Sequence, residues 1–314
     1  MLSTPRFERS IRPIFIIGAP RSGTSITTWA VGQLPNVQTM PETSWIAPMS
    51  TAAHLAFGYG SSRGRYSHLS NVAYPHRHFM RRMGEAIDAI VQDCFVERCH
   101  RLYGDFEANG ELRPSTELES TAFQVRHSVD EPKQRWIDGT PYNTYFTWAL
   151  AQMFPEAVFL HNLRRPEDVA TSLEGFDKLG ADPLALVDGL NVWSSHTEAA
   201  WLTERALGKR RVYRLHFDRI GSDSEAVFRE VAEFIGEPYT SDMLAPLRTR
   251  INSSDVDERR ADNLERLAKL EEFRRCQRLY DDVLRTPAGD TPDADAMETL
   301  RTRFVDYTAH HPLL

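Results

Sequence analysis

The sequence has few cysteines, and none of them is arranged in a recognisable motif. Cys94, Cys99 and Cys276 are the three cysteines among 314 residues, and no Cys-x-x-Cys pair occurs. An odd number of isolated cysteines argues against a disulfide framework and predicts free thiols in a reducing compartment. The chain therefore has to be stabilised by a hydrophobic core, which its length allows.

Long apolar runs and an excess of positive charge are also missing. The N-terminal segment carries Arg6, Arg9 and Arg12 but only a short apolar run, so we expect neither a signal peptide nor a membrane span. A cytoplasmic protein is the corresponding expectation. The net charge of −7 argues against a nucleic-acid partner that is held through its phosphates.

What the chain does have is an alternation of strand and helix patterns, with 41% hydrophobic and 26% charged residues. Strands are expected at 12–18, 135–138, 157–162 and 210–215, and helices at 23–34, 77–103, 115–129, 142–153, 166–176, 182–207, 223–235 and 257–284. The alternation predicts an α/β fold with a mostly parallel central sheet flanked by helices, in one domain over 1–314.

Residues 45–82 have less regular patterning, with interleaved aromatic residues and a Gly/Ser-rich stretch at 58–64. Such a segment suits a mobile lid over an acceptor site, and a lid or cap at about 45–135 is our expectation. A surface loop whose aromatic residues pack on the core is the alternative. The neighbouring histidines His76 and His78 lack further ligands in the pattern, so we expect no metal site there.

A glycine-bearing turn follows the first apolar run. The run Ile14 to Ile17 leads into the sequence Gly18-Ala19-Pro20-Arg21-Ser22-Gly23-Thr24-Ser25. The pattern predicts a buried strand, a tight loop and a helix whose first N–H groups have no partner within the helix. These N–H groups and the helix dipole favour a phosphate-like anion. An ordinary turn that uses glycine for its backbone angles and Ser or Thr as a cap is the alternative.

The spacing of the two loop glycines matches a Walker A loop, but the residues after them do not. The Lys-Ser/Thr pair that should follow is replaced by Thr24-Ser25, and the cation comes earlier, at Arg21. A nucleoside triphosphate loop needs its lysine on the terminal phosphates and its hydroxyl on Mg²⁺. The loop therefore favours a ligand whose terminal group differs from that of a nucleoside triphosphate.

A second strand, turn and helix pattern covers residues 157–176. Arg164 precedes the helix that Pro166 is expected to open, and Ser172 lies about two turns into it. If the start of the helix folds back beside Arg164, the guanidinium and the hydroxyl can hold one phosphate. The alternative is that Arg164 and Arg165 pair with surface carboxylates.

Together these segments resemble the sulfotransferases that use 3′-phosphoadenosine 5′-phosphosulfate (PAPS). The resemblance rests on Arg21-Ser22-Gly23-Thr24 and on Leu163-Arg164-x-Pro166-x-Asp168-Val169-Ala170-x-Ser172. Three further stretches agree with it in family order: Trp136–Asn143, which contains Thr140-Pro141, Met153–Ala157, and Val212–Asp218 followed by Glu225–Gly236. The departures are His216-Phe217-Asp218, which lacks a usual aromatic hydroxyl, and Asp138-Gly139 in place of Glu-Lys.

The resemblance implies a P-loop-like sulfotransferase fold and a division of the cofactor site. Arg21, the N–H groups of Ser22, Gly23, Thr24 and Ser25, and the hydroxyls of Thr24 and Ser25 would hold the 5′-phosphosulfate. Arg164 and Ser172 would hold the 3′-phosphate, and no metal would be required. The acceptor would be a hydroxyl or amine of a small molecule, a glycan or a natural product, and the product would be adenosine 3′,5′-bisphosphate.

The resemblance also assigns catalytic roles to Arg21 and to Glu42, which lies at the family's distance from the loop and would accept the acceptor's proton. A surface glutamate at 42, with a histidine such as His127 as the base, is the alternative. Two other functions stay open: a P-loop small-molecule kinase, and a catalytically silent nucleotide or glycan binder.

Overall fold

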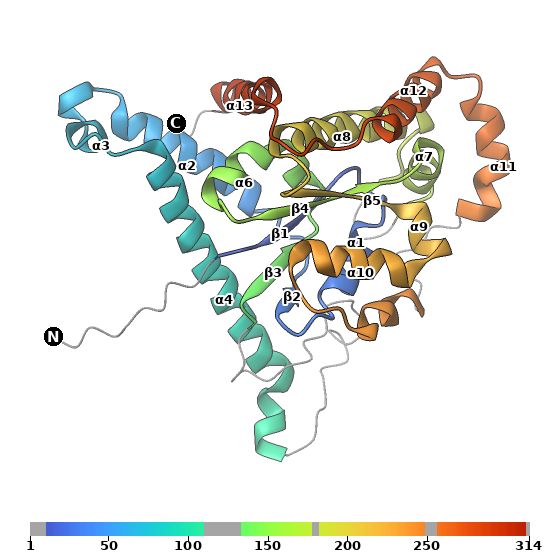
Figure 1. The fold of residues 1–314 in the computed structure, drawn as a ribbon, viewed down its shortest axis with the longest axis horizontal. Coiled ribbons are helices and arrows are strands. Elements are labelled where there is room, and N and C mark those ends of the chain that lie inside the picture. Colours follow the sequence, from blue (N-terminus) through green and yellow to red (C-terminus); the bar gives the residue numbers. More distant parts are fainter. Residues whose placement is uncertain (1–10, 110–132, 178–181, 249–255, 312–314) are drawn as a thin grey trace.

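The computed structural model describes residues 11–109, 133–177, 182–248 and 256–311. Its centre is a five-stranded sheet in which every recorded pairing is parallel (Figure 1). The strands, in spatial order, are β2 (Val37–Thr39), β3 (Arg135–Asp138), β1 (Ile14–Ile17), β4 (Val158–Leu163) and β5 (Val212–His216). Ile14 of β1 pairs with Ile137 on one side and with Val158 on the other, which places β1 at the middle of the sheet.

Helices cover both faces of the sheet (Figure 1). They are α1 (Thr24–Val31), α2 (Ile46–Ser61), α3 (His68–Asn71), α4 (His76–Asn109), α6 (Thr147–Met153), α7 (Pro166–Glu174), α8 (Leu186–Leu207), α9 (Phe217–Ser222), α10 (Ser224–Ile235), α11 (Val256–Leu267), α12 (Glu271–Arg285) and α13 (Ala294–Ala309). Three 3₁₀ segments complete the described elements: η1 (Gly64–Tyr66), η2 (Pro141–Phe146) and η3 (Ser241–Arg248).

The central strand explains why both faces need a cover. All four residues of β1 are fully buried, as expected of a parallel strand between two helical layers. Phe15 and Ile17 pack into one core with residues of α2, α4, α6 and α8. Ile14 and Ile16 point to the opposite face and pack with residues of α1 and α10.

The observed fold confirms the α/β prediction and all four expected strands, and two elements differ from those expected. The short strand β2 was not predicted, because three residues carry too little pattern. The expected helix 257–284 is wrong as one element, since the chain breaks between α11 and α12 and thereby lets Leu267 and Phe273 pack into the same core cluster. The expected helix at 115–129 lies outside the described residues.

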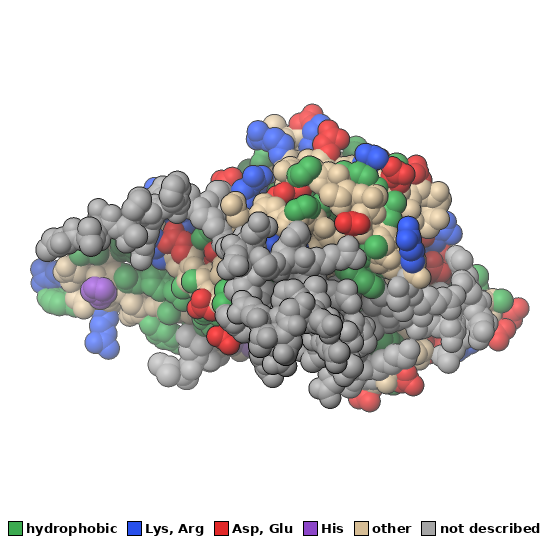
Figure 2. Space-filling model, turned by 90° about the horizontal axis from the view of Figure 1, so that it is seen from below, with side chains coloured by type: hydrophobic (Ala, Val, Ile, Leu, Met, Phe, Trp, Pro, Cys, Tyr) green, Lys and Arg blue, Asp and Glu red, His purple; other side chains and the backbone are tan. Residues whose placement is uncertain are grey.

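The segment 45–82 is also more regular than its sequence indicates. It forms all of α2, then η1, α3 and the start of α4. Seen from below, the extension on the left that contains these elements carries many hydrophobic side chains (Figure 2). Tyr59, Tyr66 and Val72 are among its exposed members, at 49%, 77% and 64% exposure. Within the described ranges, no helix is both long enough and apolar enough to span a membrane.

Candidate functional site

The loop between β1 and α1 is held in place by close backbone contacts at its two glycines. Gly18 and Gly23 have φ angles of +121° and +90°, in the region that favours glycine. A Cβ atom on Gly18 would lie 2.5 Å from the carbonyl oxygen of Asn162, and one on Gly23 would lie 2.3 Å from the ring of Phe217. Neither position has room for a side chain. The glycines therefore let the loop pack closely against β4 and against Phe217.

Arg21 connects the two segments that the sequence singles out. Its Nε donates a hydrogen bond of 3.0 Å to Ser172 Oγ in α7. The guanidinium carbon lies 3.9 Å from the ring centroid of Phe176, a cation–π contact. In the other direction, Arg164 Nη1 donates a hydrogen bond of 2.9 Å to the carbonyl oxygen of Arg21. The first loop, Arg164 and Ser172 thus form one cluster.

Two adjacent arginines precede α7 and point to different places. The guanidinium carbon of Arg164 lies 4.4 Å from the ring centroid of Phe217, and Trp193 Nε1 donates a hydrogen bond of 2.9 Å to the Arg164 carbonyl oxygen. Arg165 instead forms an exposed ion pair of 2.8 Å with Asp218. Arg164 therefore belongs to the site, whereas Arg165 makes the surface pair that was the alternative for both residues.

The cluster is positively charged and partly withdrawn from solvent. Burial and the nearby Arg164 lower the pKa of Arg21 to about 10, while the charge of Glu42 acts in the opposite direction. Ser22 Oγ is buried, and it has no hydrogen-bond partner among the described residues. Thr24 and Ser25 are the first residues of α1, whose N-terminal N–H groups have no acceptor within the helix. These groups together suit a bound anion.

Glu42 lies next to this cluster, in the segment between β2 and α2. With Ser25, Thr28, Met40 and Gly139 it lines a small recess. Glu42 as a whole residue is exposed, yet partial burial of its carboxylate raises the pKa of Glu42. The charge of Asp138 raises this pKa further, and Arg21 lowers it in part. A carboxylate in this setting holds a proton more readily than a fully solvated glutamate.

The segment that carries Glu42 is anchored to the end of β3. Thr43 donates two hydrogen bonds: its N–H to Thr140 Oγ1 at 2.9 Å, and its hydroxyl to Asp138 Oδ2 at 2.8 Å. The buried Asp138 also accepts bonds from the hydroxyl and N–H of Thr140, at 2.6 and 3.0 Å, and from Asn143 Nδ2 at 2.7 Å. The Asp138-Gly139 pair therefore has a positioning role here.

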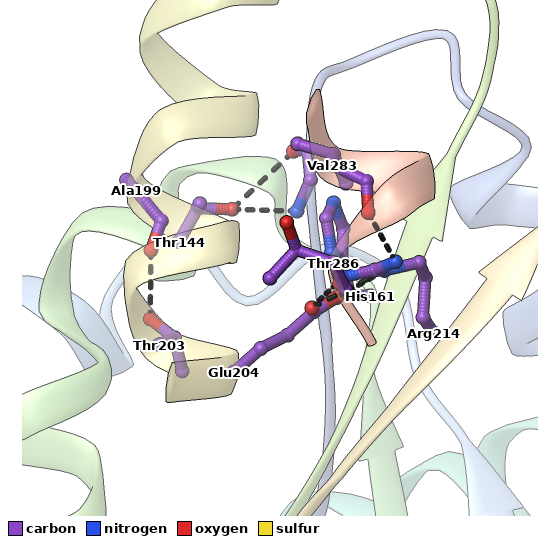
Figure 3. A network of polar contacts seen from close by, with 9 residues as sticks. Thr144, His161, Ala199, Thr203, Glu204, Arg214, Val283 and Thr286 are labelled. Atoms are coloured by element: carbon purple, nitrogen blue, oxygen red, sulfur yellow. Dashed lines mark hydrogen bonds and ion pairs between the residues drawn. The ribbon is translucent and has the colours of Figure 1, made fainter. Parts of the chain in front are cut away.

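A buried polar network supports the loop from the other side (Figure 3). Thr144 Oγ1 accepts a hydrogen bond of 2.9 Å from the N–H of Gly18. His161 of β4 bonds to Glu204 of α8 at 2.5 Å, and Arg214 of β5 pairs with the same carboxylate. Arg214 also donates to the carbonyl oxygens of Val283 and Thr286, at 2.6 and 2.9 Å. The network links two strands to α8 and to the end of α12.

Several of these residues have no signal in the sequence. Phe176, Phe217, Trp193 and Thr144 each contact the loop or Arg164 from a distant part of the chain. Phe176, Thr144 and Phe217 lie at or beside the motif segments, but no motif predicts these contacts. The alternative base His127 lies outside the described residues. In the part of the chain that the structure describes, no three His, Cys, Asp or Glu side chains are arranged to hold a metal ion.

Of three comparisons with known proteins, the match to a family model agrees with the motifs. No curated protein sequence matches the chain. Among solved structures it is similar to the sulfotransferase domain of the Synechococcus PCC 7002 olefin synthase, with 15% identity, 95% of this chain and 97% of that chain covered, and a TM-score of 0.44. It is also similar to the Mycobacterium avium sulfotransferase STF9, with 16% identity, coverage of 90% and 78%, and a TM-score of 0.45. A sequence model described as "Sulfotransferase family" matches residues 13–241. The chain belongs to the sulfotransferase family.

Proposed function

We propose that the protein transfers a sulfuryl group from PAPS to a hydroxyl or amine of a small-molecule, glycan or natural-product acceptor. The observation that carries the proposal is the cluster in which Arg21 contacts Ser172 and Arg164 contacts the Arg21 carbonyl. This arrangement concentrates two guanidinium groups, a hydroxyl and a helix N-terminus within a single site. A ligand with two separate anionic groups would match these donors.

The residues present fit the cofactor. Ser22 Oγ is a buried hydroxyl without a partner among the described residues, and the missing Cβ of Gly23 lets the loop pack against the Phe217 ring. Arg21, with the N–H groups of Ser22, Gly23, Thr24 and Ser25 and the hydroxyls of Thr24 and Ser25, would hold the 5′-phosphosulfate. Arg164 and Ser172 would hold the 3′-phosphate. When bound, PAPS supplies the sulfuryl group.

Glu42 and Arg21 would have the two catalytic roles, proton acceptance and charge stabilisation. Glu42 would accept the proton of the acceptor hydroxyl, and its raised pKa makes it a stronger base than an ordinary glutamate. Arg21 lies close enough to influence the charge of Glu42, and it would stabilise negative charge that develops on the leaving oxygen. Thr43 and Asp138 would keep the Glu42 segment at the mouth of the site.

The alternative functions make different demands on the loop. A kinase would need a lysine and a Mg²⁺-binding hydroxyl directly after Gly23, where the chain has Thr24-Ser25. A silent binder would need no carboxylate with a raised pKa beside the loop. The recess that contains Glu42 therefore favours an enzyme over a binding module.

A thermal-shift comparison tests the cofactor. Adenosine 3′,5′-bisphosphate should raise the melting temperature without divalent metal, since a ligand at one hundred times its Kd contributes about 2.7 kcal/mol. ATP with Mg²⁺ is the control and should have a smaller effect. Stabilisation by ATP with Mg²⁺ alone would identify a kinase-like site. A mixed acceptor panel, read by mass spectrometry for added sulfate, then separates an enzyme from a silent binder.

A further inference from the structure

A second and larger cavity is bordered by η2, the segment that follows β3. Its volume is about 420 Å³. It lies between η2, α8 and α13, and it is lined by Tyr142, Thr144, Tyr145, Phe146, Ser195, Glu198, Ala199, Leu300, Arg303 and Tyr307. A volume of this size falls within the range of pockets that bind small organic molecules.

Aromatic rings make up much of the wall. Tyr142 lies 4.8 Å from Phe146, and Phe146 lies 5.2 Å from Tyr307, measured between ring centroids. Their planes are tilted or perpendicular, so ring edges and faces are both presented to the cavity. Tyr142 and Tyr145 remain 41% and 37% exposed, although large aromatic side chains usually gain from burial. The two rings already contact each other, with centroids 6.1 Å apart, so a ligand ring placed against the pair would bury this surface.

The hydroxyl groups that line the cavity are paired with one another or with the backbone. The hydroxyls of Tyr142 and Tyr307 lie 3.0 Å apart and form one hydrogen bond, and the Tyr145 hydroxyl lies 2.9 Å from Ser195 Oγ. Glu198 and Arg303 contribute one charge of each sign. An aromatic wall with paired hydroxyl groups and balanced charges suits a neutral ring compound that carries a hydroxyl group.

The cavity is connected to the cofactor site through one chain segment. Gly139 lines the recess of Glu42, and Tyr142 to Phe146 line the cavity a few residues later. Within this segment, the Thr144 hydroxyl accepts the hydrogen bond from the N–H of Gly18, the first glycine of the loop. The same 3₁₀ segment therefore borders the cavity and positions the start of the loop.

We infer that this cavity binds the ring system of the acceptor, and that the acceptor class is a hydroxylated aromatic compound of moderate size. The inference rests on the proposed function and extends it to a substrate class. It also assigns the acceptor site to η2, α8 and α13, apart from the segment 45–82 in which the sequence suggests a lid. None of the lining residues comes from that segment.

A direct binding measurement tests the inference without turnover. 2-Naphthol is the probe, titrated by calorimetry into the protein in the presence of adenosine 3′,5′-bisphosphate. The substitution Leu300→Trp places a larger side chain at a buried position of the wall and should weaken 2-naphthol binding at least tenfold. Leu284→Trp, at a position that is 42% exposed on α12, is the matched control and should have no effect. Bisphosphate affinity should be unchanged in both variants.

A second pair of variants covers the case in which Leu300→Trp does not fold. Tyr142→Ala and Tyr145→Ala truncate half-exposed rings and should each weaken 2-naphthol binding several-fold or more. Methyl glucoside, a hydroxylated ring without aromatic character, should bind the parent at least tenfold more weakly than 2-naphthol. Equal affinities for the two compounds would overturn the acceptor class. Unchanged 2-naphthol affinity in the folded cavity variants, or no binding to the parent, would overturn the site.

Failure of the proposed function has a different signature. In that case adenosine 3′,5′-bisphosphate would not bind to the parent protein, whereas the 2-naphthol titration without nucleotide would still report on the cavity. Binding of 2-naphthol that is lost in Leu300→Trp would then support the cavity as a binding site. The two failures are therefore distinguishable.

Discussion

At the scale of single residues, Glu42 and Arg21 influence each other through their charges. Burial and Asp138 raise the pKa of Glu42, and burial and Arg164 lower the pKa of Arg21. Each residue opposes the shift of the other, because opposite charges favour both ionised forms. The pair therefore combines a base and a cation at one site, where the charges of reacting groups would change.

The substitution Glu42→Gln should separate chemistry from binding. The amide keeps the shape of the side chain but cannot accept a proton, so turnover should fall by about 10²–10⁴-fold. Adenosine 3′,5′-bisphosphate affinity should stay nearly unchanged. In the parent, turnover should decline at acidic pH with a midpoint above the ordinary glutamate value, because the raised pKa of Glu42 means that protonation begins at higher pH. Full turnover in the variant would assign the base elsewhere, with His127 next to be tested.

Arg164 and Arg165 provide a matched pair for the 3′-phosphate. Arg164→Ala removes a charge-assisted hydrogen-bond donor, for which about 1.5–3 kcal/mol is typical, so bisphosphate affinity should fall roughly tenfold to a hundredfold. Arg165→Ala removes an exposed ion pair with Asp218 and should change the affinity little. Calorimetric titration of both variants provides the comparison. Similar losses in the two would show that only the overall positive charge matters.

At the scale of elements, two strand, loop and helix units meet at the carboxyl ends of β1 and β4. Phe217, at the start of α9, lies against both of them through Gly23 and Arg164. Arg21 then bonds to α7 through Ser172. The geometry of the site thus depends on where the N-termini of α1, α7 and α9 lie relative to the carboxyl ends of the strands.

Gly23→Ala tests this arrangement at the contact between α1 and α9. The new Cβ would lie 2.3 Å from the Phe217 ring at a φ of +90°, so the loop or the ring has to move. We expect at least a tenfold loss of bisphosphate affinity. Gly58→Ala is the control, because a Cβ there meets nothing within 4 Å. Alanine is also the better helix former, so that variant should be as stable as the parent or slightly more stable. Parent-like bisphosphate affinity in Gly23→Ala would contradict the proposed loop geometry.

At the scale of the whole molecule, an aromatic cluster joins the N-terminal half to the last helix. His54 Nδ1 and His76 Nε2 lie 3.1 Å apart and connect α2 to α4. The ring of His76 stacks on Trp148, and the ring of His54 meets Phe304 of α13 edge on. Burial and His54 lower the pKa of His76 to about 4, and burial and Arg301 lower that of His54. The cluster is therefore neutral at physiological pH.

This cluster predicts a loss of stability in acid. A histidine with a lowered pKa binds its proton more readily in the unfolded chain, so its contribution is present above about pH 6.5 and is lost as the pH falls towards 4. His76→Asn should reduce the drop in melting temperature between pH 7.5 and pH 5. His78→Asn, at an exposed neighbour, is the control and should preserve the drop. An identical pH dependence in all three proteins would show that other groups control the acid response.

The sequence by itself determined the features that contiguous residues encode. The apolar run Ile14 to Ile17, the two glycines and Arg21 predict a strand, an anion-binding loop and a helix, since buried strands and helix starts have local patterns. The same holds for the unit that carries Arg164 and Ser172. The family assignment followed from these motifs and their order, and the matching family model confirmed it.

Only the tertiary structure decided which distant residues meet. Phe217, Phe176, Trp193 and Thr144 reach the loop or Arg164 from far along the chain, and nothing in their local sequence signals it. The helices of 45–82 and the break between α11 and α12 were likewise missed, because packing against neighbouring elements outweighs weak local preferences. The cavity between η2, α8 and α13 depends on how these three elements pack, and no single segment of sequence encodes such an arrangement.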